Sequence, residues 1–235
     1  MNLGELRGWV RRQSREVSAA VVPDAEIDSY INEGYRHLAN STASLRADIE
    51  VTLVASALEV TLPEYGFGVI RAQVKNDKLL RTTGVRQLET IYGTDWRNRS
   101  NATSPDYILP LSPQLFRVIP FIAPGESSVV LEFYCAISPG SEVGNPFPYL
   151  TSDGNSPLLP SAYHLALPYY SMREIMLRDV TNPEMMARGR SYEALLLAIL
   201  EAIRQSTSNL EGGILAGPIP SIPAAPIGGA APQGQ

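Results

Sequence analysis

The sequence has very few of the side chains that build most catalytic and metal centres. Cys135 is its only cysteine, and His37 and His164 are its only histidines. A single cysteine excludes an internal disulfide framework and a cysteine-rich zinc site, and it fits a protein made in a reducing compartment. Neither histidine lies in an HExxH pattern, and no serine lies in a Gly-x-Ser-x-Gly turn. The sequence therefore predicts no catalytic residue, no metal site and no bound cofactor.

Long hydrophobic runs and an excess of positive charge are also lacking. No run approaches the length of a membrane span, and the opening MNLGELRGWVRRQ interleaves charges with apolar residues, unlike a signal peptide. We therefore expect a protein that is made inside the cell and has no membrane partner. The net charge is −5, so the overall electrostatics do not favour wrapping of nucleic acid.

The clearest periodic pattern lies in residues 24–40, which read DAEIDSYINEGYRHLAN. Its apolar positions share one helical face: Ile27, Tyr30, Ile31, Gly34, Tyr35 and Leu38. We predict a helix after Pro23, with the Asp24 side chain accepting hydrogen bonds from the first free backbone N–H groups. Gly34 interrupts the apolar face, so another backbone should approach closely there. A helix this short needs partners along that face.

Residues 3–18 form a predicted first helix with a basic edge. Four arginines recur along it: Arg7, Arg11, Arg12 and Arg15. One interpretation is a solvated face that is partnered by Glu5 and Glu16. The other is contact with an acidic partner surface or with DNA, although no aromatic residues are interleaved as in many nucleic-acid sites. The short connection to residue 24 predicts an antiparallel helical hairpin.

Alternating apolar and polar residues between positions 46 and 137 predict short β-strands. The expected strands are 46–55, 58–63, 69–74, 78–80, 107–110, 115–119 and 128–136. Asn76-Asp77 should form a hairpin turn, residues 85–92 a short helix beside the sheet, and residues 93–106 a long loop that contains Trp96. Cys135 falls on the more apolar side of the last strand, so we expect a buried thiol. These segments predict a small, mostly antiparallel sandwich or barrel.

Helical periodicity returns after an irregular segment that is rich in Pro, Gly, Ser and Asn. A helix should open at Ser161, with Pro168 either kinking it or shortening its first part, and another should start at Pro183. These helices can pack on the first pair. The predicted fold class is therefore α+β: an antiparallel helical bundle built from N- and C-terminal helices, with an inserted small antiparallel β-domain and an extended C-terminal arm. The expected units are 1–45 (N-terminal helical hairpin), 46–150 (inserted β-domain), 151–210 (C-terminal helices) and 211–235 (arm).

The end of the chain carries no charge. Residues 212–235 read GGILAGPIPSIPAAPIGGAAPQGQ, a composition that disfavours a regular helix or a central strand. Five larger apolar residues recur along it: Ile214, Leu215, Ile219, Ile222 and Ile227. A flexible linker or loose tail is one interpretation. Because the segment lacks the hydrophobic density to fold alone, we favour an arm that docks on a neighbouring chain.

Several short motifs occur in a characteristic order over about residues 3–206. They are PDAEIDSYINEGYRHLA, the Leu62-Pro63 step, the NDK turn before Leu79-Leu80, PDYILP, LEFYCAISP and LLPSAYHLALPYYSMREI. In this order the sequence resembles the head-to-tail adaptor (connector) proteins in the necks of tailed bacteriophages of the podophage and siphophage types.

The resemblance implies a structural virion protein without enzymatic activity. Such adaptors form a ring, typically a dodecamer, that docks beneath the portal, links the capsid to the tail and lines the DNA channel. The implied partners are further copies of the chain, the portal protein, tail, nozzle or tail-tube proteins, and the viral DNA in the lumen. The C-terminal segment of such adaptors commonly reaches into the portal, and it corresponds here to residues 212–235.

Two other functions stay open at this point. A small DNA-binding protein would use the Arg7–Arg15 face, and its binding would weaken steeply with salt. A virion-associated hydrolase would need a cleft with clustered titratable groups.

Overall fold

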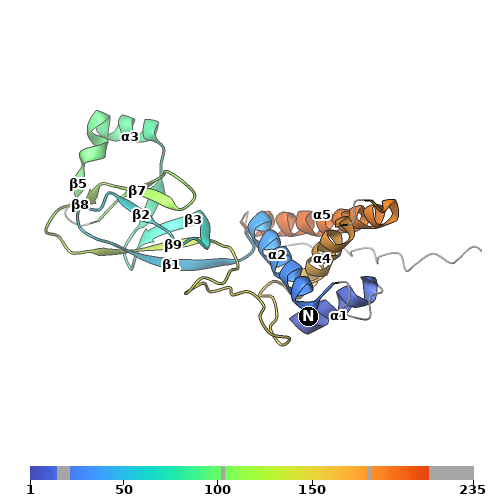
Figure 1. Cartoon of the computed structure of the whole chain (residues 1–235). Helices are drawn as coiled ribbons and strands as arrows, with labels where there is room; N and C mark the ends of the chain where they lie inside the picture. Colours follow the sequence, from blue (N-terminus) through green and yellow to red (C-terminus); the bar gives the residue numbers. More distant parts are fainter. Residues whose placement is uncertain (15–21, 102–103, 179–180, 212–235) are drawn as a thin grey trace, which may run out of the picture.

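The chain folds into a group of helices and a β-rich part that lie next to each other (Figure 1). The computed structural model describes residues 1–14, 22–101, 104–178 and 181–211. The helices of the first part come from both ends of the chain, and the strands come from the middle. The predicted α+β class is confirmed.

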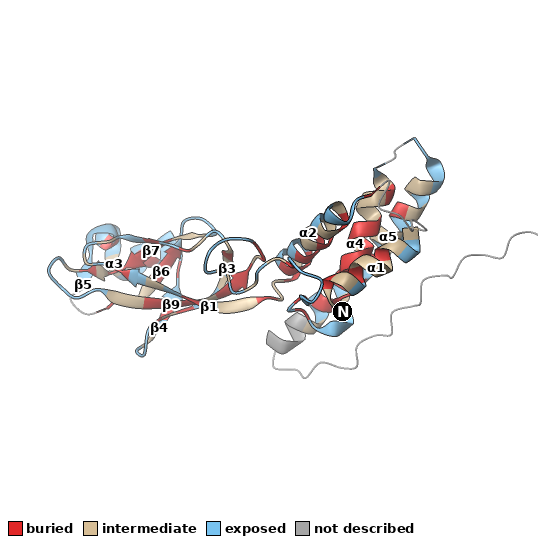
Figure 2. Ribbon diagram, turned by 60° about the horizontal axis from the view of Figure 1, so that its bottom comes forward, coloured by how far each residue is buried: buried red, intermediate tan, exposed pale blue. Residues whose placement is uncertain are grey.

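Four long helices share one apolar core, although they are far apart in the sequence. They are α1 (Leu3–Ser14), α2 (Asp24–Thr42), α4 (Ala166–Leu177) and α5 (Pro183–Glu211), with a short 3₁₀ helix η2 (Ser161–Tyr163) before α4. Each helix contributes fully buried residues, such as Leu6, Ile31, Leu167 and Ile199. Figure 2 shows these buried stripes on the faces that the helices turn toward one another. Since burial of one such side chain contributes about 1.5–3 kcal/mol, the N- and C-terminal helices stabilise each other.

Local chemistry explains where the C-terminal helices begin. The Asn182 side-chain oxygen accepts hydrogen bonds from the backbone N–H groups of Glu184 (3.0 Å) and Met185 (3.3 Å), so it caps α5 at the predicted start. Pro168 lies in the first turn of α4, where its missing N–H breaks no helical hydrogen bond. The helix α5 runs from Pro183 to Glu211.

Two predictions for α2 need correction. The helix begins at Asp24, but no side chain caps it, because the Asp24 carboxylate binds Arg11 on α1 instead. A close neighbour does lie at Gly34, but it is a side chain and not a backbone. A Cβ atom at this position would lie 3.0 Å from Cβ of Tyr170 on α4, so the glycine lets α2 and α4 pack closely.

The middle of the chain forms a seven-stranded sheet in the order β1-β9-β3-β4-β6-β7-β2. Its strands are β1 (Arg46–Leu53), β2 (Glu59–Thr61), β3 (Gly66–Val74), β4 (Leu79–Thr82), β6 (Tyr107–Pro110), β7 (Leu115–Ile119) and β9 (Val129–Ile137). All expected strands are present, and every neighbouring pair is antiparallel except β4 and β6. A small parallel pair, β5 (Ser100–Asn101) with β8 (Phe121–Ile122), is additional. The sequence pattern does not predict β5 and β8, because a strand of two residues is too short to show alternation of apolar and polar residues.

The sheet curls because its two edge strands are consecutive in the chain. Residues 54–58 alone join β1 to β2 and can span about 20 Å, whereas a flat seven-stranded sheet is about 29 Å wide. The two walls of the curled sheet meet in a second apolar core. There the rings of Phe116 on β7 and Phe133 on β9 lie 5.6 Å apart, and Cys135 is fully buried beside them, as predicted.

The two tight connections of the sheet follow the sequence signals. Asn76 adopts a left-handed conformation (φ 59°) in the β3–β4 hairpin, which Val74 closes by donating its N–H to the Lys78 carbonyl (2.8 Å). The parallel step from β4 to β6 requires a crossover, and α3 (Val85–Tyr92) supplies it at the predicted position. The predicted loop after it instead begins with a 3₁₀ helix, η1 (Gly93–Asn98), that buries Trp96.

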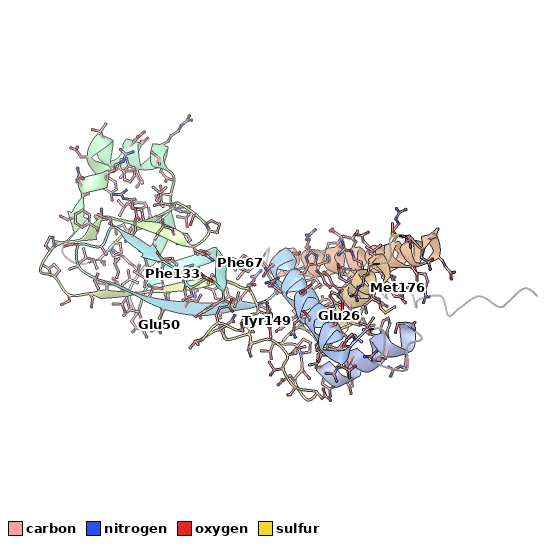
Figure 3. All side chains as sticks on the ribbon, in the orientation of Figure 1. Glu26, Glu50, Phe67, Phe133, Tyr149 and Met176 are labelled. Carbon is pink, nitrogen blue, oxygen red and sulfur yellow. The ribbon has the colours of Figure 1, made fainter. Side chains whose placement is uncertain are left out.

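The irregular segment 138–160 links the two cores. The Asn32 side chain on α2 exchanges two hydrogen bonds with the backbone of Leu150, at 2.8 and 3.0 Å, and Phe147 packs against both cores. Figure 3 shows Tyr149 of this segment between the helices and the β-rich part. The expected division into units at residues 45 and 150 stays a prediction.

We predict that Gly34 and Gly8 respond differently to the same change. Alanine within a helix gains up to about 1 kcal/mol over glycine. Gly8→Ala should gain this stability, because only Arg12 lies within 4 Å of the added Cβ. Gly34→Ala should show no such gain in the free energy of unfolding, or should lower it, because the added Cβ would contact Tyr170. Urea unfolding followed by circular dichroism measures both, and equal gains would contradict the close packing of α2 on α4.

We also predict that the Cys135 thiol is inert in the folded protein. Burial, together with the charge of Asp48, raises the pKa of this thiol to about 11, so little thiolate exists at pH 8. Iodoacetamide at pH 8 should label the native protein far more slowly than the protein in concentrated urea. Equal labelling rates, read by mass spectrometry, would show that the thiol is accessible.

Candidate functional site

The basic edge that the sequence places on α1 is largely neutralised within the fold. Arg7 makes a two-pronged ion pair with Asp28 on α2, with bonds of 2.8 and 2.6 Å, and a further contact with Asp153 at 3.0 Å. Arg11 binds the Asp24 carboxylate and donates to the Val22 carbonyl at 2.8 Å. These two side chains therefore hold α1 against α2. Of the two predicted partners, Glu5 lies 4.0 Å from the Met1 ammonium, and Glu16 lies outside the described residues.

The charges of this cluster stabilise one another. The hydrogen bonds that Arg7 donates to Asp28 raise the already high pKa of Arg7, and the bond that Arg11 donates to Asp24 lowers the pKa of Asp24. Since the pKa of Asp24 is lowered in the folded state, its contribution to stability is present at neutral pH and is lost as the pH falls through that pKa. Of the four predicted arginines, Arg12 is exposed on α1 and Arg15 lies outside the described residues.

A second group of arginines gathers at the opposite end of the molecule, on the segment that we call the tip. The tip consists of α3, η1 and the residues that flank them, 81–99. Its small core contains Leu88 and Trp96, packed on Leu109 and Ile119 from the outer face of β6 and β7. Figure 1 shows α3 standing off this side of the β-rich part.

Aromatic rings hold the arginine side chains at the tip. The Arg97 guanidinium lies 4.5 Å from the centre of the Trp96 ring, and that of Arg117 lies 5.8 Å from it. Arg99 lies 5.3 Å from the centre of the Tyr92 ring. Arg97 and Arg99 are exposed, and neither makes an ion pair with any described residue. A guanidinium held on a ring loses little side-chain entropy on binding, so this surface is prepared for an anionic partner.

Apolar surface accompanies the arginines. Ile91 is 45% exposed and Val85 is 40% exposed on α3. Trp96 is buried, and its indole N–H finds no acceptor among the described residues. The sequence pattern predicts a helix followed by a loop here, and it assigns the arginines no role. The signal that could have found them is the close sequence of Tyr92, Trp96 and the two arginines.

A hollow lies on the curled sheet. It has a volume of about 340 Å³, and its walls carry no charged residue: Gly68, Val69, Thr82, Ile108, Pro110, Leu111, Ser112, Pro113 and Phe116. Such a neutral, partly apolar lining suits an uncharged peptide better than a charged metabolite. The predicted arm residues Ile214, Leu215, Ile219, Ile222 and Ile227 lie outside the described residues.

The two histidines occupy structural positions. His164 is buried, accepts from the Met1 ammonium at Nδ1 (2.8 Å), and donates from Nε2 to the Leu159 carbonyl (2.9 Å). His37 lies against Tyr170, where burial and the charge of Arg173 lower its pKa. Within the described ranges no three His, Cys, Asp or Glu side chains gather as metal ligands would. No described helix has the length and apolar character to cross a membrane.

We predict that the ion pair between Arg7 and Asp28 contributes measurably to stability. Asp28→Ala should lower the free energy of unfolding by about 1.5–3 kcal/mol, because it leaves a half-buried guanidinium without its main partner. Arg12→Ala is the matched control on the same helix and should change it by less than about 0.5 kcal/mol. Urea titrations of both variants decide this, and equal effects would count against the pairing.

The comparisons with known proteins agree with a docking role. The chain matches the family model described as "SU10 adaptor protein" over residues 1–215. No curated protein matches the sequence. The match covers nearly all described residues of both cores, and it points to a structural function rather than to catalysis. The chain therefore belongs to the SU10 adaptor protein family, a family of structural adaptors of bacteriophages.

Proposed function

We propose that this protein is the head-to-tail adaptor of a tailed-phage neck, where it forms a ring beneath the portal and links the capsid to the tail. The family match over residues 1–215 is the observation that carries this proposal. The partners would be further copies of the chain, typically twelve in a ring, the portal protein above, and tail, nozzle or tail-tube proteins below. The work of such a protein is binding, so it requires docking surfaces and a rigid body.

The helical part has the properties that a load-bearing ring segment needs. Its core joins helices from both ends of the chain. At the surface, the ion pairs Arg7–Asp28 and Arg11–Asp24 connect α1 with α2, and Arg178 at the end of α4 pairs with Glu26 on α2 (2.7 Å), which connects the two ends of the chain. Because neither pair of helices can separate without exposing this core, the subunit resists deformation. A ring of such subunits would transmit force between head and tail without unfolding.

The position where α5 ends supports a docking role for the arm. Arg204 donates to the Ser41 carbonyl at the end of α2 (3.2 Å), and the Tyr163 and Ser206 hydroxyls lie 3.1 Å apart. These contacts hold α5 on the bundle as far as Ser206, a few residues before the predicted arm begins. We propose that residues 212–235 dock on the portal, with Ile214, Ile219 and Ile222 among the anchors. Twelve such arms would act together, so weak individual contacts would suffice.

The negative net charge suits a channel through which DNA passes. An acidic lumen would make few phosphate contacts, so DNA would slide without being held. A positive potential measured on the lumen side of the assembled ring would remove this part of the proposal. The alternative of a DNA-binding protein that uses Arg7 and Arg11 is less favoured, since both side chains already bind carboxylates.

Removal of the arm tests the proposed docking. A chain that ends at Glu211 keeps every described element, so its circular dichroism spectrum and urea midpoint should match those of the full chain. In a pull-down with the portal protein of the same phage, the shortened chain should bind at least about tenfold more weakly, a loss of about 1.4 kcal/mol.

A control isolates the role of the apolar anchors. Replacement of Ile214, Ile219 and Ile222 together by serine keeps the length of the arm and should weaken portal binding in the same way. Electron microscopy of the adaptor with its portal should show a ring that the full chain completes. Undiminished portal binding without the arm, or a particle with the adaptor elsewhere than the neck, would contradict the proposal.

A further inference from the structure

We propose that the tip of one subunit binds the outer face of β1 and β9 on the next subunit, and that this contact helps to close the ring. The inference rests on the proposed function, because it names the surfaces through which neighbouring copies would meet. It starts from the uneven distribution of charge in the middle of the chain.

Positive charge is concentrated at the tip. Residues 81–99 carry four arginines and two carboxylates, whereas the remainder of residues 46–150 carries five basic and nine acidic residues. None of the four arginines, Arg81, Arg86, Arg97 and Arg99, makes an ion pair with a described residue. The β-rich part therefore presents a basic end and an acidic remainder, which complement each other between two copies but not within one.

The outer face of β1 and β9 carries three carboxylates, Asp48, Glu50 and Glu132, and the cations beside them are Lys75 and Arg71 on the β3 side, where Arg71 lies 5.7 Å from the centre of the Tyr134 ring. Glu50 lies directly opposite Glu132 in the strand register, an arrangement of like charges that is unfavourable. Lys75 binds Glu50 at 2.6 Å and also lies in the electrostatic field of Glu132, which accepts a hydrogen bond from the neutral Gln73. Asp48 on the same side of β1 is exposed and makes no ion pair with a described residue. An incoming guanidinium would relieve the repulsion at this face.

The two surfaces face in opposite directions, as a ring requires. Ile108 and Val118 point into the core between the walls, so their neighbours Leu109 and Ile119 point outward, where they carry the tip. On the other wall Ile49 and Phe133 point inward, so Asp48 and Glu132 point outward. Figure 3 shows Glu50 on the lower side of the β-rich part, and Figure 1 shows α3 on the upper side in the same orientation. A closed ring is built from two different, complementary patches of this kind on each copy.

The composition of the tip favours a protein partner over DNA. Exposed Ile91 and Val85 accompany the arginines, and arginine with aliphatic and aromatic groups is typical of protein interfaces. Glu89 and Asp95 on the same segment would repel phosphates but could pair with Lys75 or with other cations of a neighbouring copy. The second copy of the chain is therefore the partner whose charges fit best.

A charge swap between the two surfaces tests the inference. The full chain is compared with the variant Arg97→Glu/Arg99→Glu and with the variant Asp48→Arg/Glu132→Arg, by sedimentation velocity and mass photometry at about 50 mM salt, where screening is weak. We expect each variant alone to associate at least tenfold more weakly than the unaltered chain. Arg190→Glu, which changes an exposed arginine of α5 that makes no ion pair with a described residue, is the matched control and should associate normally.

Mixing the two variants gives the decisive result. Each acidic tip would then meet a basic face and each basic tip an acidic face, so an alternating ring should form and restore association. Circular dichroism and urea midpoints establish that every variant is folded. Failure of the mixture to recover, or undiminished association of either variant, overturns the inference.

Two further outcomes separate this inference from the proposed function. An unaltered chain that stays monomeric at low salt overturns the tip contact, while portal binding by the arm is measured independently. Normal association of Arg97→Glu/Arg99→Glu together with loss of binding to a duplex DNA probe would assign the tip to DNA and overturn the inference. In both cases the proposed adaptor function is tested separately, by the portal-binding experiment.

Discussion

Packing of α2 against α4 is the contact on which the rest of the structure depends, because it joins the two ends of the chain. Gly34 permits the close approach to Tyr170, and the apolar stripes of α1 and α5 complete the same core. With the ends joined, the middle of the chain leaves the bundle at β1 and returns through residues 138–160. The β-rich part is therefore attached to the helical bundle by two chain connections, at the start of β1 and through residues 138–160, and by the hydrogen bonds between Asn32 and Leu150.

The ion pairs divide the arginines of this protein into two groups with different physical roles. Arg7 and Arg11 lie beside carboxylates of α2, so their charge is used to hold two helices together. Arg97 and Arg99 lie on aromatic rings and meet no described carboxylate, so their charge is available to a partner. The same residue type thus serves stability in the bundle and, we propose, assembly at the tip. A count of arginines along the sequence cannot make this distinction.

For a structural adaptor, rigidity and surface chemistry take the place of an active site. The family match gives the general role, and the two cores explain how a single chain can present a helical body and a separate β-rich surface. A short link joins β1 and β2, the two edge strands of the curled sheet. In the contact between copies that we propose, side-chain charges would select one neighbour and one orientation.

The sequence by itself determined the elements whose signal is local. The periodicity of residues 24–40, the alternation in the strands, the Asn76 turn, the start at Pro183 and the buried Cys135 are all found as predicted, because each depends on neighbours in the chain. Only the tertiary structure decided which groups meet across the chain. In the folded chain Asp24 binds Arg11 instead of capping its helix, and Tyr170 packs against Gly34. Trp96 packs on the outer face of β6 and β7. Such contacts follow from the packing of segments that are far apart in the sequence, and a pattern of neighbouring residues carries no information about that packing.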